Sequence, residues 1–283
     1  MRYGPWRMTA SSTADTDRLD PWTIGAIAVV AYALSNIVHE GLGHGGACIA
    51  VGGHPSQLTA VFFQGDEDGL PASAGRWVAA GGSLANLAVA ALAWAALRVF
   101  PAGWGRARFF WWLLLAVNLL QAFGYLLFSG IGGIGDWAVV VHDFQPAVLW
   151  RLGLTVAGAV LYFLVAPRLI MPWLEPFLPA APAERLGRAR TLSVLPYLVG
   201  GVTFVLAGVL NPLGWVYVLI SAVAASFGGT SLLVWYPVLW ARRTPVGSPR
   251  VPLGIPRSSA WLAAAAVALI VFVGVLGPGI RLG

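Results

Sequence analysis

The residues best suited to chemistry form one short run, His39-Glu40-Gly41-Leu42-Gly43-His44, inside an otherwise apolar segment. We interpret this run as an HExxH motif, whose two histidines share one face of an α-helix and reach one metal ion. Glu40 is rotated by about 100° from His39, so its carboxylate can take a proton from water at the metal without ligating it. Zinc is the expected metal, because it lowers the pKa of such a water to about 7.

A polar cluster that only joins helices by hydrogen bonds is the alternative explanation for these residues. Two histidines and a glutamate in an apolar spanning segment carry a large desolvation cost unless they are paired or bind an ion. Metal binding is therefore the favoured interpretation.

A catalytic zinc site needs a third protein ligand and keeps one position open for water. The glycine-rich segment after the third apolar run offers Asp136, His142 and Asp143, and His54 follows the first run. His142 competes with Asp136 because imidazole is a common zinc ligand. His54 lies at the membrane edge, where a solvated histidine is the simpler explanation. Cys48, the only cysteine, is interpreted as a small buried side chain.

The elements that hold these residues must be membrane helices. The chain has 283 residues, of which 58% are hydrophobic and 10% are charged, and its mean hydropathy is +0.78. A soluble domain of this size cannot bury so much apolar surface, so a lipid bilayer must cover part of it. Apolar segments of spanning length lie at approximately 22–50, 77–100, 108–130, 148–171, 192–211, 213–237 and 259–278. We predict an all-α polytopic membrane protein with six to seven transmembrane helices.

Two connections are expected to be irregular. Residues 52–76 contain a β-prone stretch, Leu58–Gln64, which predicts a short re-entrant hairpin after the first span. Residues 129–147 begin with a glycine-rich run that ends at Gly135, directly before Asp136. Irregular backbone at membrane depth survives only where protein buries it or where it lines a wet cavity.

The basic residues indicate the orientation of the chain. All 17 are arginines, and 14 of them lie in alternate connections. The positive-inside rule then places the N-terminus in the cytoplasm and the two histidines in the outer half of the first span. Arginines scattered singly suit lipid headgroups and give no nucleic-acid-binding face.

The chain divides into three predicted parts. Residues 1–21 are polar and of mixed charge, which predicts a disordered tail. Residues 22–147 hold the candidate chemistry, and residues 148–283 add transmembrane helices that serve as scaffold or gate. A lysine-free composition rich in alanine and glycine is typical of a GC-rich bacterial genome, so a bacterial cell membrane is the expected location.

Two further stretches complete a family pattern. Ala79 to Leu87 is a stretch of mostly small residues that contains Asn86, and Phe128 to Trp137 carries Gly135-Asp136-Trp137. With the histidine run, these stretches resemble the site-2 protease family of intramembrane metalloproteases, over residues 22 to about 145. The resemblance implies that Asp136 joins His39 and His44 as zinc ligands and that Glu40 is the catalytic base. The family's usual Asn-Pro…Asp or Leu-Asp-Gly context is replaced here by Gly-Asp-Trp.

These features predict an intramembrane zinc metalloprotease that hydrolyses a peptide bond in or near a transmembrane segment of a membrane-protein substrate. The alternative is a non-proteolytic zinc-binding membrane protein that acts as a sensor or partner regulator. A transporter is less favoured, because the spans after residue 148 lack the intramembrane charges that ion coupling needs. The sequence does not define the oligomeric state.

Overall fold

The computed structural model describes residues 17–212, 214, 218–243 and 251–283. Within these residues, six helices are long and apolar enough to cross a membrane: Pro21–Ala50, Ala72–Val99, Gly105–Gly132, Ala147–Phe177, Pro182–Val209 and Ala222–Arg242. A shorter apolar helix spans Ser259–Val275. The chain therefore has the architecture of a multi-pass, all-α membrane protein, as expected from its hydropathy.

Several spans are built from more than one type of helix. In chain order the helical elements are α1 (Pro21–Ile37), η1 (Val38–Gly45), α2 (Gly46–Ala50), α3 (Ala72–Val99), α4 (Gly105–Gly132), α5 (Asp136–Val140), α6 (Ala147–Val160), η2 (Leu161–Val165), α7 (Ala166–Leu174), η3 (Glu175–Phe177), α8 (Pro182–Val209), η4 (Val218–Gly228), α10 (Leu232–Arg243), α11 (Ser259–Leu269) and η5 (Ile270–Val275). Among them η1, η2, η4 and η5 are π-helical. The strands are β1 (His54–Leu58), β2 (Phe63–Asp66) and β3 (Ile280–Arg281).

The first span begins at a well-defined cap. Asp20 accepts a hydrogen bond of 2.8 Å from the backbone nitrogen of Thr23, and Pro21 occupies the first helical position, where its missing N–H costs nothing. Just before this cap, Leu19 forms a backbone bridge with Ile255. Of the predicted tail, residues 1–16 lie outside the described residues.

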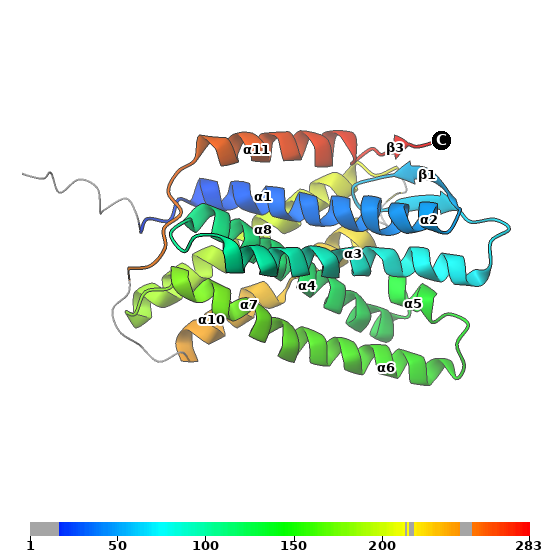
Figure 1. Ribbon diagram of the computed structural model, residues 1–283, viewed down its shortest axis with the longest axis horizontal. Helices are drawn as coiled ribbons and strands as arrows, with labels where there is room; N and C mark the ends of the chain where they lie inside the picture. Colours follow the sequence, from blue (N-terminus) through cyan, green and yellow to red (C-terminus); the bar gives the residue numbers. More distant parts are fainter. Residues whose placement is uncertain (1–16, 213, 215–217, 244–250) are drawn as a thin grey trace, which may run out of the picture.

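The helices pack around α1 and α4 (Figure 1). The helix α1 lies beside α8 and α11, whereas α4 lies between α3 and α6. Large aromatic side chains of α4, including Phe109 and Trp112, are fully buried at the centre of the main core. By contrast, α6 exposes a row of apolar side chains, including Val148, Leu152 and Val156. Such a surface is stable only against lipid or another apolar partner.

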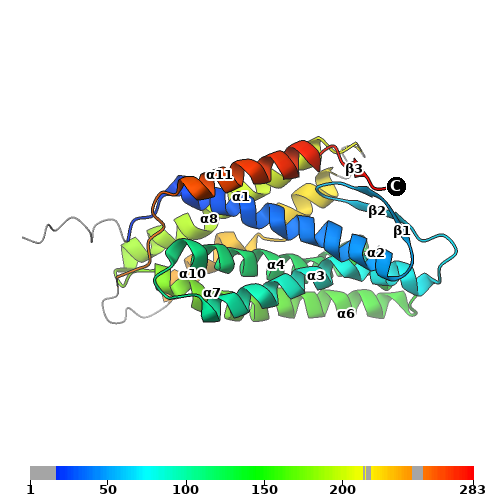
Figure 2. The same ribbon diagram turned by 45° about the horizontal axis from the view of Figure 1, so that its top comes forward.

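A small sheet covers one end of the bundle, as Figure 2 shows. The predicted hairpin is present as antiparallel β1 and β2, but its turn occupies the middle of the stretch that was expected to be a strand. A third strand, β3, comes from the C-terminus and pairs with β1, giving the order β2-β1-β3. The Asn36 side chain donates a hydrogen bond to Ala60 O in the turn, which ties the hairpin to the first span.

Candidate metal centre

His39 and His44 lie in the π-helical stretch η1 and not on a regular α-helix. The two histidines are five positions apart, so the run is HExxxH and the expected HExxH spacing of four is wrong. Side chains five positions apart on an α-helix diverge by about 140°. Because π-helical hydrogen bonds join residues five apart, a π-helical turn returns the second histidine to the face of the first. The Nε2 atoms of the two rings are consequently 3.2 Å apart.

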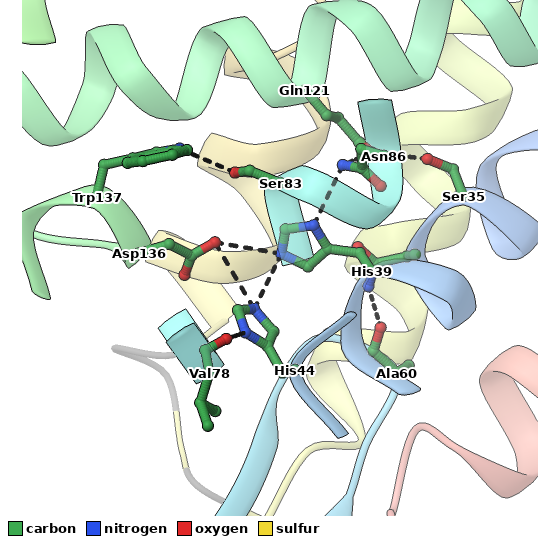
Figure 3. Close-up of polar contacts among 11 residues, drawn as sticks. Ser35, His39, His44, Ala60, Val78, Ser83, Asn86, Gln121, Asp136 and Trp137 are labelled. Carbon is green, nitrogen blue, oxygen red and sulfur yellow. Dashed lines mark hydrogen bonds and ion pairs between the residues drawn. The ribbon is translucent and has the colours of Figure 1, made fainter. Parts of the chain in front are cut away.

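Asp136 completes the cluster from a distant part of the chain (Figure 3). Its Oδ2 atom lies 3.4 Å from Nε2 of His39 and 3.6 Å from Nε2 of His44. Gly135 directly precedes it at a φ of 86°, a conformation that favours glycine. Trp137 then donates a hydrogen bond of 3.0 Å from Nε1 to Ser83 Oγ, which fixes α5 against α3.

The geometry and chemistry of these three atoms fit a metal ion. Ligand atoms placed about 2.0–2.1 Å from a tetrahedral zinc lie about 3.3–3.4 Å apart, close to the three separations of 3.2, 3.4 and 3.6 Å. The Oδ2 atom of Asp136 is buried and makes no hydrogen bond to any described residue. Two imidazole nitrogens and one carboxylate oxygen form a typical three-ligand set of a catalytic zinc site. The described residues contain one such group of histidine, cysteine or acidic side chains, and it is this one.

Glycines of α3 allow the histidines to approach that helix. A Cβ atom on Gly82 would lie 2.6 Å from Nε2 of His39 and 2.6 Å from Nε2 of His44. A Cβ atom on Gly43 would lie 2.6 Å from Gly82 Cα. The small residues of the 79–87 stretch therefore allow close helix packing, and Gly82 also leaves the space in front of the two ligand nitrogens.

Both imidazoles are held by hydrogen bonds at their other nitrogen. Nδ1 of His44 donates to Val78 O over 2.7 Å, which leaves Nε2 of that ring unprotonated in its neutral form. Nδ1 of His39 lies 3.1 Å from Nδ2 of Asn86. When this amide donates to Nδ1, the His39 proton sits on Nε2 and points at the lone pair of His44. In this tautomer Nε2–H of His39 donates to Nε2 of His44 over 3.2 Å.

Metal binding by both Nε2 atoms requires the other tautomer of His39, with Nδ1–H donating to Asn86 Oδ1. This hydrogen bond requires the Asn86 amide to rotate so that its oxygen and nitrogen exchange places, and the neighbouring residues can accommodate that rotation. Asn86 Oδ1 and Gln121 Nε2 are both buried without a hydrogen-bond partner among the described residues. Rotating both amides places Gln121 Nε2 next to Asn86 and 2.7 Å from Ser35 Oγ, which in turn lies 3.1 Å from Asn118 Oδ1. Four fully buried polar side chains thus form a chain behind His39.

Glu40 and Tyr125 lie beside the three candidate ligands. The Glu40 side chain is buried and close enough to His44 and Asp136 to interact electrostatically with both. The Tyr125 ring stacks on His39 with centroids 5.2 Å apart. Glu40 therefore lies near the three candidate ligands, and its role as catalytic base stays a prediction, whereas the contact of Tyr125 with His39 was not foreseen.

The other candidate ligands lie elsewhere. The side chain of His142 is 81% exposed and bonds to Asp143 over 2.8 Å, and Asp143 also pairs with Arg76 at 3.1 Å. Hydrogen bonds from His142 and Arg76 hold the pKa of Asp143 below its ordinary value. His54 is exposed on β1. Cys48 is buried among apolar side chains, as expected.

Compared with protein-family models, curated proteins and solved structures, the chain matches none. The resemblance to site-2 proteases thus rests on the sequence motifs alone, and the histidine run departs from HExxH by one residue.

Proposed function

We propose that this chain is an intramembrane zinc metalloprotease that cleaves a peptide bond in or near a transmembrane segment of a membrane protein. The observation that carries the proposal is the convergence of His39, His44 and Asp136 on one point, with a buried carboxylate oxygen that has no hydrogen-bond partner among the described residues. Burial of such an oxygen is costly unless a cation accompanies it.

The residues around the centre have the roles that peptide hydrolysis needs. Zinc, held by His39, His44 and Asp136, would polarise the carbonyl of the scissile peptide and acidify water. Glu40 accepts the proton of the attacking water at its carboxylate and delivers it to the leaving amine. The side chain of Asn86 orients His39, and Val78 O orients His44.

The hairpin supplies a means of holding the substrate. A transmembrane helix must unwind locally before its backbone can be cleaved, because its carbonyls are already hydrogen-bonded. The strand β2 pairs with β1 on one side, and in the described sheet its other edge is unpaired. That edge can bind an unwound stretch of substrate as an added strand.

The proposal is tested first by the zinc content of the purified protein. We expect about one zinc per chain in the wild type and less than about a tenth of this amount in Asp136→Ala. Asp143→Ala is the matched control, because it removes an exposed carboxylate seven positions along the chain and should leave zinc unchanged. A folded wild type that binds no zinc after reconstitution would refute the proposal.

Catalysis is tested separately from binding. Glu40→Gln should keep the zinc and abolish proteolysis, since the amide has no proton-accepting carboxylate. New N-termini of membrane proteins are compared by mass spectrometry between cells that express the wild type and cells that express Glu40→Gln. Zinc-loaded protein that generates no such termini, in any membrane tested, would instead support the zinc-binding sensor.

A further inference from the structure

A large cavity adjoins the metal centre on the side of the C-terminal helices. Its volume is about 700 Å³, and Asp136 forms part of its wall. This is within the range of cavities that enclose small ligands, roughly 300–1,000 Å³. Most of the remaining wall comes from the second half of α4, from η2, and from η4 and the residues that follow it.

The wall of the cavity is apolar and partly made of very small residues. Leu127, Phe128 and Phe163 provide bulky apolar surface, whereas Ala225 and Gly228 leave room. Asp136 is the one charged residue of the lining. A ligand that fills this space must therefore be apolar along its length and polar only where it meets the metal centre.

The polar groups of the far wall are already engaged with one another. The hydroxyl of Tyr162 donates to Gly229 O over 2.8 Å and lies 3.2 Å from Ser231 Oγ. The backbone nitrogen of Leu232 also donates to Tyr162. These bonds satisfy the backbone where η4 ends and α10 begins, so the wall is preformed and has few free polar groups for a hydrophilic ligand.

The cavity opens toward the exterior of the bundle. Three lining residues, Ile131, Val139 and Phe163, are 64%, 52% and 50% exposed. Phe163 follows α6 on the span Ala147–Phe177, which is the least buried of the six candidate membrane spans. Apolar material thus has a path from the membrane to Asp136 that does not cross the polar network behind His39.

We infer that this cavity binds apolar residues of the substrate next to the scissile peptide bond, and that η2 and η4 thereby determine specificity. The inference rests on the proposed function, because it takes the metal centre as the site of cleavage. It assigns the C-terminal helices a part in selecting the substrate, beyond a role as scaffold. An extended apolar peptide is favoured as the occupant, because Phe62 from the hairpin turn also lines the cavity. A peptide held at the β2 edge therefore lies close to its mouth.

Hydroxamates test the inference without a known substrate, because they chelate the metal and carry a variable group beside it. The protein is loaded with Co²⁺ in phosphatidylcholine nanodiscs, and binding is followed by the visible absorbance of the metal. The probes are acetohydroxamate, hydroxamates bearing dileucine on either side of the chelating group, and decanohydroxamate. Burial of one leucine side chain strengthens binding by about tenfold or more. We therefore expect at least one dileucine probe to bind much more tightly than acetohydroxamate.

Gly228→Phe is the decisive variant. Gly228 lines the cavity, and a Cβ atom there meets no atom within 4 Å, so a side chain can be added without a clash. We expect it to weaken the preferred dileucine probe by about tenfold or more. Gly153→Phe is the matched control, since Gly153 is also open but lies on α6 outside the lining. Gly153→Phe should change the affinity for the probe less than twofold. Because the probe partitions into lipid to the same extent with both variants, a difference between them reports on the cavity.

The outcomes separate the two proposals. If acetohydroxamate leaves the Co²⁺ spectrum of the wild type unchanged, the metal centre itself is refuted. The cavity is not the substrate site if acetohydroxamate binds but the dileucine probes bind no more tightly. The same conclusion follows if both glycine variants weaken the binding of the dileucine probes equally. Tight binding of decanohydroxamate alone would overturn the peptide assignment in favour of a lipid acyl chain.

Discussion

The two halves of the chain both contain π-helical turns, but these turns carry different side chains. In the N-terminal half, η1 holds His39 and His44, which are buried and fixed by hydrogen bonds to α3. In the C-terminal half, η2 and η4 hold apolar or very small residues that line the cavity. A π-helical turn redirects side chains that an α-helix would point elsewhere. The π-helical turns thus orient the candidate metal ligands in the N-terminal half and form part of the cavity wall in the C-terminal half.

The largest effect on the N-terminal side is expected from Gly82→Ala. The added methyl group would lie 2.6 Å from both Nε2 atoms, which is closer than non-bonded atoms approach, so it occupies the space a metal needs. We expect zinc to fall below about a tenth of an equivalent per chain. Zinc is measured by atomic emission on protein whose fold is checked by thermal unfolding.

Gly75→Ala is the control for this substitution. It lies on the same helix, where a Cβ atom would meet only Glu67 Oε2 at 3.5 Å, an ordinary contact. It should bind zinc like the wild type. Full zinc occupancy in a well-folded Gly82→Ala protein would mean that the metal does not lie between the two imidazoles.

A smaller effect is expected from Asn86→Leu. Leucine removes the partner of His39 Nδ1, and loss of such a contact weakens metal binding by about 10- to 100-fold. Asn86→Asp separates the two possible directions of this hydrogen bond, because a carboxylate can only accept. Zinc affinity is measured by competition with a chelator of known strength.

An aspartate variant that retains affinity within about tenfold would establish that Nδ1–H of His39 donates in the metal-bound state. If the leucine and aspartate variants weaken binding equally, the proposed rotation of the Asn86 and Gln121 amides is wrong.

The π-helical turn itself is tested by deletion of Gly41. The deletion places the two histidines four positions apart, which restores one face on a regular α-helix. We expect zinc affinity to change by less than about tenfold, because removing one residue from the π-helical turn leaves α1 and α2 joined as a regular α-helix. Circular dichroism and chelator competition on the same sample show whether the fold and the site survive together.

Deletion of Gly43 is the matched comparison. It gives the same spacing but moves Leu42 to the position where any Cβ atom would collide with Gly82. It should lose zinc. Equal loss in the two deletion variants would show that the five-residue spacing is itself required.

Much of this fold could be predicted from sequence, because each span is an apolar run of the required length. The histidines, Glu40 and Asp136 could also be identified, because ionisable residues among apolar ones are conspicuous. The predicted HExxH spacing is wrong, because the two histidines are five positions apart in the sequence itself. The π-helical turn that brings them together could not be predicted, because periodicity arguments assume an α-helix. The third strand β3 was not foreseen, since its two residues pair with β1 from the opposite end of the chain and carry no strand pattern of their own. The cavity depends on the relative placement of α4, η2 and η4, which no local pattern encodes.

The smallest effect is expected from His142→Ala, which decides between the two ligands that the sequence left open. His142 lies six positions after Asp136, yet its imidazole is 81% exposed and bonded to Asp143. Exposed pairs of this kind contribute little to stability. We expect zinc content and affinity to match the wild type, and the melting temperature to change only slightly. Loss of zinc in this variant, measured beside Asp136→Ala, would move the third ligand from the start of α5 to the turn that follows it. The metal would then lie outside the buried polar half of the molecule and away from the cavity.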